Sequence, residues 1–215
     1  MISDGTTQLL LDCGIPFREV QKKTGFRIHE ISGCLITHEH GDHASGVAKM
    51  AEAGIECFMS DGTRIALGIN HHRIQTVRSR EPFTIGTWSI TPFDVQHDAA
   101  EPLGFVMTSN STGERLLYAT DTVYLKYRFS RLTHIMIEAN YSPEKMSGID
   151  PAMRHRIVRS HMSIETTKQY LATNDLSKVV EIWLIHLSDG NSDAERFKRE
   201  VQELTGKQVY IAEAG

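Results

Sequence analysis

The chain has 215 residues, of which 40% are hydrophobic, so it is long enough for one globular domain, 1–215, with a core of its own. A formal net charge of −4 at pH 7 argues against a protein that coats nucleic acid by bulk attraction, although it is compatible with a local basic patch. Three widely spaced cysteines, no apolar stretch near 18 residues and no basic-then-apolar N-terminus predict a cytoplasmic protein without membrane contact.

The first 60 residues alternate short apolar strands with helical segments. Strands are expected over 8–12, 32–37 and 55–58, and helices over 17–24 and 47–53, the second ended by Gly54. Residues 82–117 instead favour two hairpins, 83–85 with 88–95 and 103–109 with 114–119, closed by turns that contain Gly86 and Gly113.

The last third of the chain is richer in helices. Ser163 is expected to cap a helix over 164–172, and the capping box Ser192-Asp193-Ala194-Glu195 begins a helix that ends near Gly206. The almost continuously apolar run 179–185 between them predicts a strand buried on both faces. Together these elements predict an α/β (α+β) fold in which stacked sheets are covered by helices, an αββα layering.

Residues 37–46, Thr-His-Glu-His-Gly-Asp-His-Ala-Ser-Gly, concentrate metal-binding side chains directly after an apolar run. If the strand geometry persisted, His38 and His40 would point the same way, and the Gly41 turn would bring Asp42 and His43 to a second point. Imidazoles and a carboxylate suit zinc, manganese or iron, and two ligand groups side by side indicate two metals. The alternative is a polar loop with chance histidines.

Three later residues each follow an apolar strand. His97, Asp121 and His186 come after the runs 90–96, 116–120 and 182–185. Open α/β sheets keep their chemistry at the strand ends, so these side chains are candidates for the remaining ligands. A histidine at a strand end is more commonly a satisfied surface or core residue, but three such positions after the first cluster favour a shared site.

The order of these motifs resembles the metallo-β-lactamase superfamily over nearly the whole chain. The segments that carry the resemblance are Thr37–His43, Val95-Gln-His-Asp98 followed by Gly104-Phe105, Ala119-Thr-Asp-Thr122, Ser160-His-Met-Ser163 and Leu184-Ile-His-Leu-Ser188. The chain is most similar to the YycJ/WalJ-type and ribonuclease Z-like phosphodiesterase branch, including its small phage-carried members. That resemblance implies a metallo-β-lactamase αββα sandwich.

The resemblance also implies a ligand set for two divalent metal ions, zinc or manganese. One ion would be held by His38, His40 and His97, and the other by Asp42, His43 and His186. Asp121 would bridge the two ions together with a water or hydroxide. Asp42 would also help to hold the nucleophile.

His161 is the residue on which the choice of reaction depends. Phosphodiesterases of this branch carry a proton-donating histidine at the corresponding position, so the resemblance implies that His161 is the general acid. Glu138 ends the apolar run 135–137 and could orient that imidazole. The alternatives are a surface histidine next to a helix cap and an exposed carboxylate.

A basic run precedes His161. Arg154, His155, Arg156 and Arg159 fall within one or two helical turns, and bidentate contacts of the three arginines with substrate phosphates would explain their placement. A solvated helix face is the commoner reason for such a run, and both interpretations stay open.

The chain departs from the family at its start. Family members usually have a strand and a Gly/Ser-rich turn before the segment that resembles residues 3–12, and this first strand is expected to be missing here. An open strand edge favours association, so a homodimer is one expectation. The missing turn also puts the activity of these 215 residues in doubt.

The leading functional prediction is a metal-dependent phosphodiesterase or nuclease with a nucleic acid or cyclic nucleotide as its substrate. Its two versions are a DNA exonuclease and an anti-Pycsar-like hydrolase of cyclic nucleotides. One alternative is a metal-dependent thioester or lactam hydrolase, which would not need His161. Another is a non-catalytic, metal-stabilised partner in phage recombination or replication.

Overall fold

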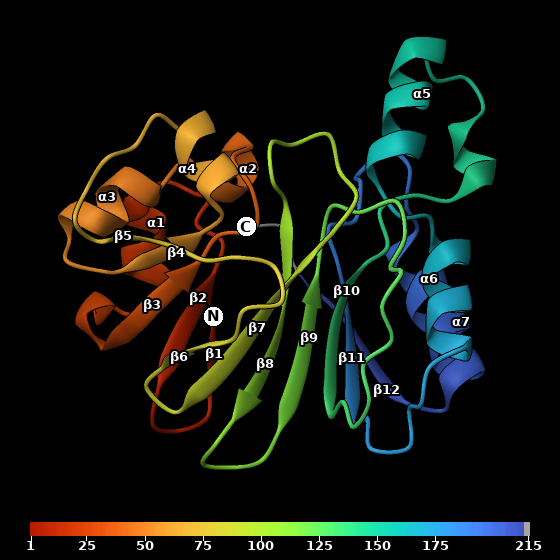
Figure 1. Ribbon diagram of the computed structural model, residues 1–215. Helices are drawn as coiled ribbons and strands as arrows, with labels where there is room; N and C mark the ends of the chain where they lie inside the picture. Colours follow the sequence, from red (N-terminus) through yellow and green to blue (C-terminus); the bar gives the residue numbers. More distant parts are fainter. Residues whose placement is uncertain (213–215) are drawn as a thin grey trace. The chain divides into compact units, whose positions relative to one another are not determined.

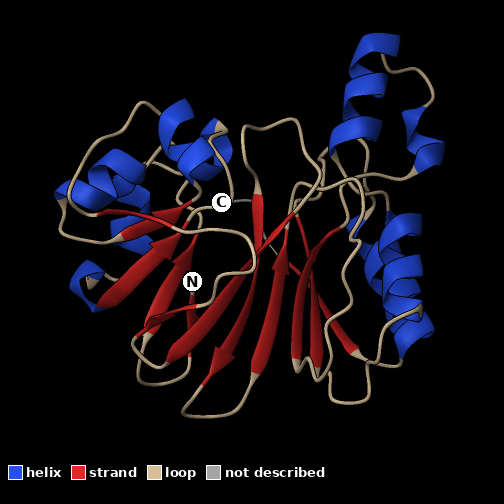
Figure 2. Cartoon of the chain, viewed as in Figure 1, coloured by secondary structure: helices blue, strands red, loops and turns tan. Residues whose placement is uncertain are grey.

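In the computed structural model, which describes residues 1–212, the chain divides into two compact units. The N-terminal unit contains Met1–Asp94 and Ala99–Gly113, and the C-terminal unit contains Val95–Asp98 and the described residues from 114 onward. Both units contain helices and strands, which Figure 2 distinguishes by colour, and the strands form two sheets. The mixed α/β class expected from the sequence is therefore confirmed.

A mostly parallel sheet is the framework of the N-terminal unit (Figure 1). Its strands, in spatial order, are β1 (Ile2–Ser3), β2 (Gln8–Leu11), β3 (Ile31–Leu35), β4 (Cys57–Met59) and β5 (Ile74–Thr76). Only β1 runs antiparallel to its neighbour. The edge beside β2 is thus formed by a two-residue strand, which offers few free backbone groups to a second copy.

Short helices connect the strands of this sheet and pack against its apolar side chains. They are α1 (Phe17–Lys23), a 3-10 turn (Ile28–Glu30), α2 (Gly41–Ala44), α3 (Val47–Glu52) and α4 (Asp61–Ala66). Met50 of α3 lies in one buried cluster with Cys34, Cys57 and Met59 of β3 and β4. All three cysteines of the chain are free and buried, as expected of small core residues.

Three antiparallel strands complete the N-terminal unit. They are β6 (Phe83–Ile85), β7 (Trp88–Asp94) and β8 (Leu103–Ser109), and β6 and β7 form the expected hairpin. Gly86 in its turn has a φ of +53°, and a Cβ there would lie 2.3 Å from the Thr7 hydroxyl oxygen. Only glycine combines that backbone conformation with so close an approach.

Four parallel strands form the framework of the C-terminal unit. They lie in the order β12 (Gln208–Ile211), β11 (Glu181–Ile185), β10 (His134–Glu138) and β9 (Arg115–Ala119). Its helices are a 3-10 turn (Pro143–Met146), α5 (Pro151–Ser160), α6 (Ile164–Ala172) and α7 (Ala194–Thr205). Because the strands are parallel, their carboxyl ends lie at one edge of the sheet, where the chemistry of such sheets is usually found.

Two local expectations are wrong. Asp193, not Ser192, caps α7: its carboxylate accepts from the Arg196 N–H at 3.1 Å, while the Ser192 hydroxyl donates to the Ser188 carbonyl. The run 179–185 is not buried on both faces throughout, because Val180 before β11 is 61% exposed. Within residues 1–212, none of the helices combines the length and apolar character needed to cross a lipid bilayer.

Asp4 joins the start of the chain to the antiparallel strands of its unit. One carboxylate oxygen accepts from the Thr7 N–H at 2.9 Å. The other accepts from the hydroxyls of Thr87, Ser109 and Ser111 at 2.6–2.7 Å. Burial acts to raise the pKa of Asp4, but these hydrogen bonds outweigh it and hold the pKa well below its usual value.

We expect Asp4→Asn to lower the free energy of unfolding at pH 7 by about 1–2 kcal/mol, since an amide loses charge-assisted bonds from three hydroxyls. Because the pKa of Asp4 is lower in the folded than in the unfolded chain, its ionised carboxylate stabilises the protein above about pH 4. This stabilisation is lost as the pH falls further. Urea unfolding at several pH values measures the difference, with Asp189→Asn on an exposed turn as the control. Equal stability of the variant and the wild type at pH 7 would contradict this role.

Candidate active site

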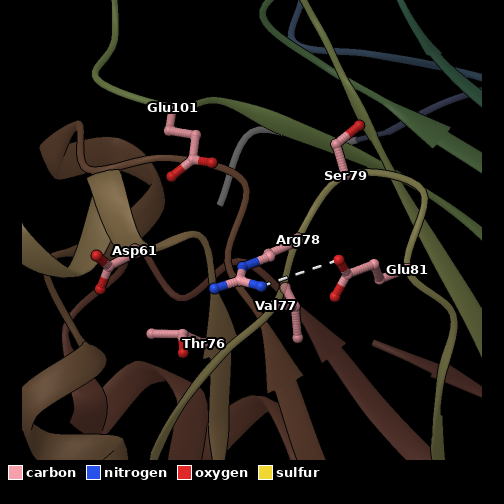
Figure 3. Close-up of a pocket in the computed structure, with 7 residues that line it drawn as sticks. All are labelled: Asp61, Thr76, Val77, Arg78, Ser79, Glu81 and Glu101. Carbon is pink, nitrogen blue, oxygen red and sulfur yellow. Dashed lines mark ion pairs between the residues drawn. The ribbon is translucent and has the colours of Figure 1, made fainter.

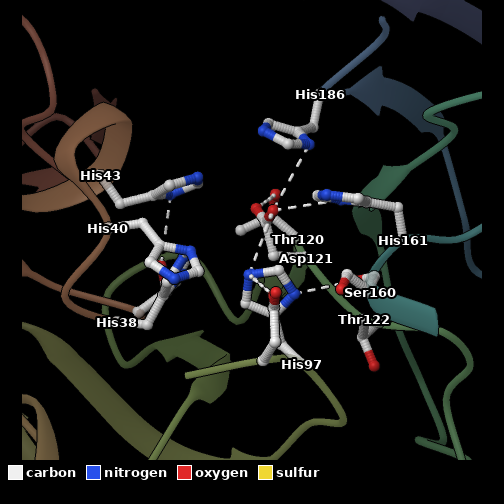
Figure 4. A network of polar contacts seen from close by, with 12 residues as sticks. His38, His40, His43, His97, Thr120, Asp121, Thr122, Ser160, His161 and His186 are labelled. Carbon is white, nitrogen blue, oxygen red and sulfur yellow. Dashed lines mark hydrogen bonds and ion pairs between the residues drawn. The ribbon is translucent and has the colours of Figure 1, made fainter. Parts of the chain in front are cut away.

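The first histidine cluster lies in the loop after β3 of the N-terminal unit. The strand ends at Leu35, so strand alternation does not orient His38 and His40. Their side chains nevertheless meet, with His38 Nε2 3.0 Å from His40 Nδ1 (Figure 4). Two nitrogens that bind one tetrahedral zinc at 2.0–2.1 Å are ~3.3 Å apart, so the pair suits a shared ion.

Asp12 orients this loop, a role that the sequence analysis missed. Its carboxylate lies 2.9 Å from His43 Nδ1 and accepts from the backbone N–H and hydroxyl of Thr37 at 2.8 and 3.0 Å. The Thr37 hydroxyl in turn lies 3.0 Å from His38 Nδ1. The available signal was an aspartate directly after an apolar strand, the same signal that singled out Asp121.

The loop packs closely against the segment after β2. A Cβ on Gly14 would lie 1.7 Å from the carbonyl oxygen of Asp42, and the Cys13 N–H donates to the His43 carbonyl at 2.8 Å. His43 is buried, whereas the Asp42 side chain next to it is 68% exposed. The close backbone contact therefore fixes the loop while it leaves the Asp42 carboxylate accessible.

In the C-terminal unit, the ends of three adjacent strands carry the predicted side chains. Asp121 lies two residues beyond β9, Glu138 ends β10, and His186 directly follows β11. Asp121 and His186 have φ values of 48° and 55°, in the left-handed region that non-glycine residues seldom occupy. Such backbone strain is typical of functional sites, where it turns a side chain in a required direction.

Glu138 is fully buried at the centre of this cluster. One carboxylate oxygen accepts from the backbone N–H groups of Thr122 and Met162 at 2.9 and 3.1 Å. The other lies 2.8 Å from His161 Nδ1 and 3.0 Å from His186 Nδ1. To donate to this oxygen, both rings must carry their proton on Nδ1, which leaves Nε2 for a ligand or a substrate.

Asp121 lies beside the same two rings. Its Oδ2 accepts from the Thr120 hydroxyl at 2.7 Å, and its Oδ1 is 3.3 Å from His161 Nδ1 and 3.8 Å from His97 Nε2 (Figure 4). Asp121, Glu138, His161 and His186 each place one ligand atom within 4.8 Å of the others. The unit thus gathers two carboxylates and several imidazoles at one edge of its sheet.

His97 is held in the same way as the other imidazoles. Its Nδ1 lies 2.8 Å from the Ser160 carbonyl oxygen, so that Nδ1 donates and Nε2 is the nitrogen left for coordination. Burial lowers the pKa of His97 in spite of the nearby Asp121 carboxylate. A lowered pKa favours the neutral imidazole, the form that binds metals.

The three predicted substrate-binding arginines lie on α5. Arg154, Arg156 and Arg159 are all exposed, and Arg156 Nε lies 3.5 Å from a carboxylate oxygen of Asp98, the residue after His97. The run is therefore helical and solvated, as the alternative interpretation required, yet one of its arginines contacts the His97 segment.

The N-terminal unit also has a pocket of about 500 Å³ (Figure 3), lined by Asp61, Thr76, Val77, Arg78, Ser79, Glu81 and Glu101. Two of these lining residues, Arg78 and Glu81, form a long ion pair of 4.0 Å. Within the described chain, its lining includes none of the predicted ligands. We therefore do not assign the chemistry to this pocket.

The model of the β-lactamase superfamily domain matches residues 7–187 of the chain. The chain belongs to this family. The match runs through both units, and it includes His38, His97, Asp121 and His161. As a member, the protein is a hydrolase with a fold that binds divalent metal ions, and clusters of imidazoles and carboxylates with fixed Nδ1 atoms fit that group.

Two relatives are similar over most of their length. The exodeoxyribonuclease YycJ of Bacillus anthracis is 27% identical over 237 aligned positions, which cover all of this chain and 88% of the relative. The exodeoxyribonuclease WalJ of Streptococcus pneumoniae is 26% identical over 207 positions, 87% of this chain and 76% of the relative.

A solved structure supports the fold assignment. The metallo-β-lactamase fold protein YhfI from Bacillus subtilis matches with a TM-score of 0.74 over 99% of this chain and 87% of its own, at 16% identity. At that identity the likeness establishes the shared fold, while the function must be argued from the site.

We expect Glu138→Gln to weaken divalent metal binding by about 10–100-fold, because the ring of His186 loses the carboxylate that orients it. The amide NH2 group of glutamine would also replace one of the two oxygens that accept hydrogen bonds here, so N–H groups would lose their acceptor. The free energy of unfolding of the variant should therefore be lower by about 1–3 kcal/mol. Competition with a chromophoric chelator measures the affinity, and thermal unfolding measures the stability.

The matched control is Glu181→Gln, at the opposite end of β11, which should bind metal as the wild type does. Wild-type metal affinity in the Glu138 variant would show that this carboxylate does not orient the site.

Proposed function

We propose that the protein is a two-metal hydrolase of phosphodiester bonds, with DNA as its substrate. The observation that carries this proposal is the buried Glu138 carboxylate between two imidazoles. It leaves Nε2 of His186 for a metal ion and Nε2 of His161 for the reacting group. A hydrolase that only polarised a carbonyl group would need the first imidazole but not the second.

We further propose that seven side chains hold two divalent ions, zinc or manganese. His38, His40 and His97 would bind the first, Asp42, His43 and His186 would bind the second, and Asp121 would serve both. The 3.0 Å approach of His38 Nε2 to His40 Nδ1 supports the first set. The Nδ1 atoms of His43 and His186 next to carboxylates, at 2.9 and 3.0 Å, support the second.

When bound, two such ions lower the pKa of a shared water and neutralise the charge that develops on the phosphoryl group. His161 acts as the general acid. Glu138 holds the proton on its Nδ1, so Nε2 is the nitrogen that can deliver a proton to the departing oxygen. The His161 side chain is 18% exposed, so a substrate can reach it.

DNA is the proposed substrate because both curated relatives are named exodeoxyribonucleases and this chain spans most of their length. A deoxyribose has no 2′-hydroxyl to act as an internal nucleophile, so hydrolysis must use water. The proposed site supplies an activated water and an acid for the 3′ or 5′ oxygen, the two groups that such a reaction requires.

We expect removal of metal with a chelator to abolish cleavage of DNA and of bis-p-nitrophenyl phosphate, and restored zinc or manganese to recover it. His161→Ala should reduce DNA cleavage by about 10²–10⁴-fold while metal content stays unchanged. The loss should be smaller on bis-p-nitrophenyl phosphate, because p-nitrophenolate departs without a proton. Parallel assays on DNA, RNA and cyclic nucleotides test the substrate.

His72→Ala on an exposed loop is the matched control and should cleave DNA as the wild type does. Undiminished DNA cleavage by the His161 variant would refute the general acid. A preference for cyclic nucleotides over DNA would refute the substrate.

A further inference from the structure

Helix α5 is exposed along most of its length. Asp150 caps it by accepting from the N–H groups of Ala152 and Met153, and Pro151 occupies its first position, so the cap stabilises the helix locally. Of its ten residues only Ser160 is buried. In Figure 1, α6 and α7 lie beside the parallel strands, whereas α5 extends beyond the strand ends. A helix held in this way presents its side chains to a partner.

One face of α5 combines positive charge with an exposed apolar residue. At 100° per residue, Arg154, His155, Val158 and Arg159 fall within a sector about 140° wide, which we call the α5 basic face. Val158 is 42% exposed. The helix has no acidic residue, in a chain whose net charge is −4.

The arginines of this face are not neutralised by any residue that the structure describes. Among residues 1–212, no carboxylate lies within ion-pair distance of Arg154 or Arg159, whereas Arg156 on the other side of the helix pairs with Asp98. Two unpaired guanidinium groups on either side of an apolar residue are complementary to two phosphates with a sugar or base between them.

The helix is tied directly to a predicted metal ligand. The carbonyl oxygen of its last residue, Ser160, lies 2.8 Å from His97 Nδ1, and His161 follows Ser160 directly in the chain. Arg159 is therefore two residues from the proposed general acid. Arg154 is five residues from Arg159, about 7.5 Å along the helix axis, so the two guanidinium groups can contact different phosphates of one strand.

We propose that the α5 basic face binds the backbone of a single-stranded DNA segment that adjoins the scissile bond, an inference that rests on the proposed function. The arginines pair with two phosphates outside the reacting group, and Val158 contacts the sugar or base between them. The substrate is then a strand of at least several nucleotides, since a cyclic mononucleotide cannot reach both arginines.

The test compares R154Q/R159Q with the wild type. Fluorescence anisotropy of a labelled 12-nucleotide single strand, on metal-loaded protein that carries His161→Ala to prevent cleavage, should give about a tenfold higher Kd. The slope of log affinity against log salt should become shallower by about 1.4, or 0.7 for each lost phosphate contact. In active protein, the KM for cleavage of the oligonucleotide should rise.

The matched control is K198Q/R199Q on α7, which removes two charges from the same unit and should change neither the Kd nor the slope by a comparable amount. An equal loss in the control, or an unchanged slope in R154Q/R159Q, would overturn the proposal. Dependence on these arginines for RNA but not for DNA would overturn the choice of strand. If DNA binding depends on α5 but no phosphodiester is cleaved, the proposed function fails and the α5 inference stands.

Discussion

The site depends on one buried carboxylate. Glu138 ends a central strand of the C-terminal unit with no exposed surface, where an isolated charge would be strongly unfavourable. The carboxylate accepts hydrogen bonds from two backbone N–H groups and two imidazole N–H groups. The same contacts assign the protons of His161 and His186, so one set of hydrogen bonds serves both the fold and the chemistry.

Three further imidazoles follow the same rule with different acceptors, whereas His40 differs because its Nδ1 faces His38 Nε2 at 3.0 Å. The Nδ1 atom of His43 contacts the Asp12 carboxylate, that of His97 contacts the Ser160 carbonyl oxygen, and that of His38 contacts the Thr37 hydroxyl. In each of these three rings Nδ1 has a hydrogen-bond partner, so Nε2 is the nitrogen that can bind a metal ion. Repetition of this arrangement distinguishes a metal-binding site from a surface on which histidines gather by chance.

Most of the fold and the candidate residues could be predicted from the sequence, because their signals are local. The apolar runs before Thr37, Asp121 and His186 predict strands that end where the chemistry begins, and Ser163 indeed caps α6. Longer-range contacts could not be predicted. Nothing local shows that Asp12 contacts a loop 25–31 residues away, or that Asp4 accepts hydrogen bonds from hydroxyls 83–107 residues away. The cap at Asp193 was misplaced because two adjacent residues both suit that position, and only the tertiary bond of Ser192 to Ser188 separates them.

The central claim, that Glu138 directs the protons of two rings, is tested most directly by ¹⁵N NMR of histidine-labelled, zinc-loaded protein. We expect His161 and His186 both to carry a hydrogen-bonded proton on Nδ1, with Nε2 of His186 bound to metal. Protons on Nε2 and bare Nδ1 atoms in these two rings would contradict it.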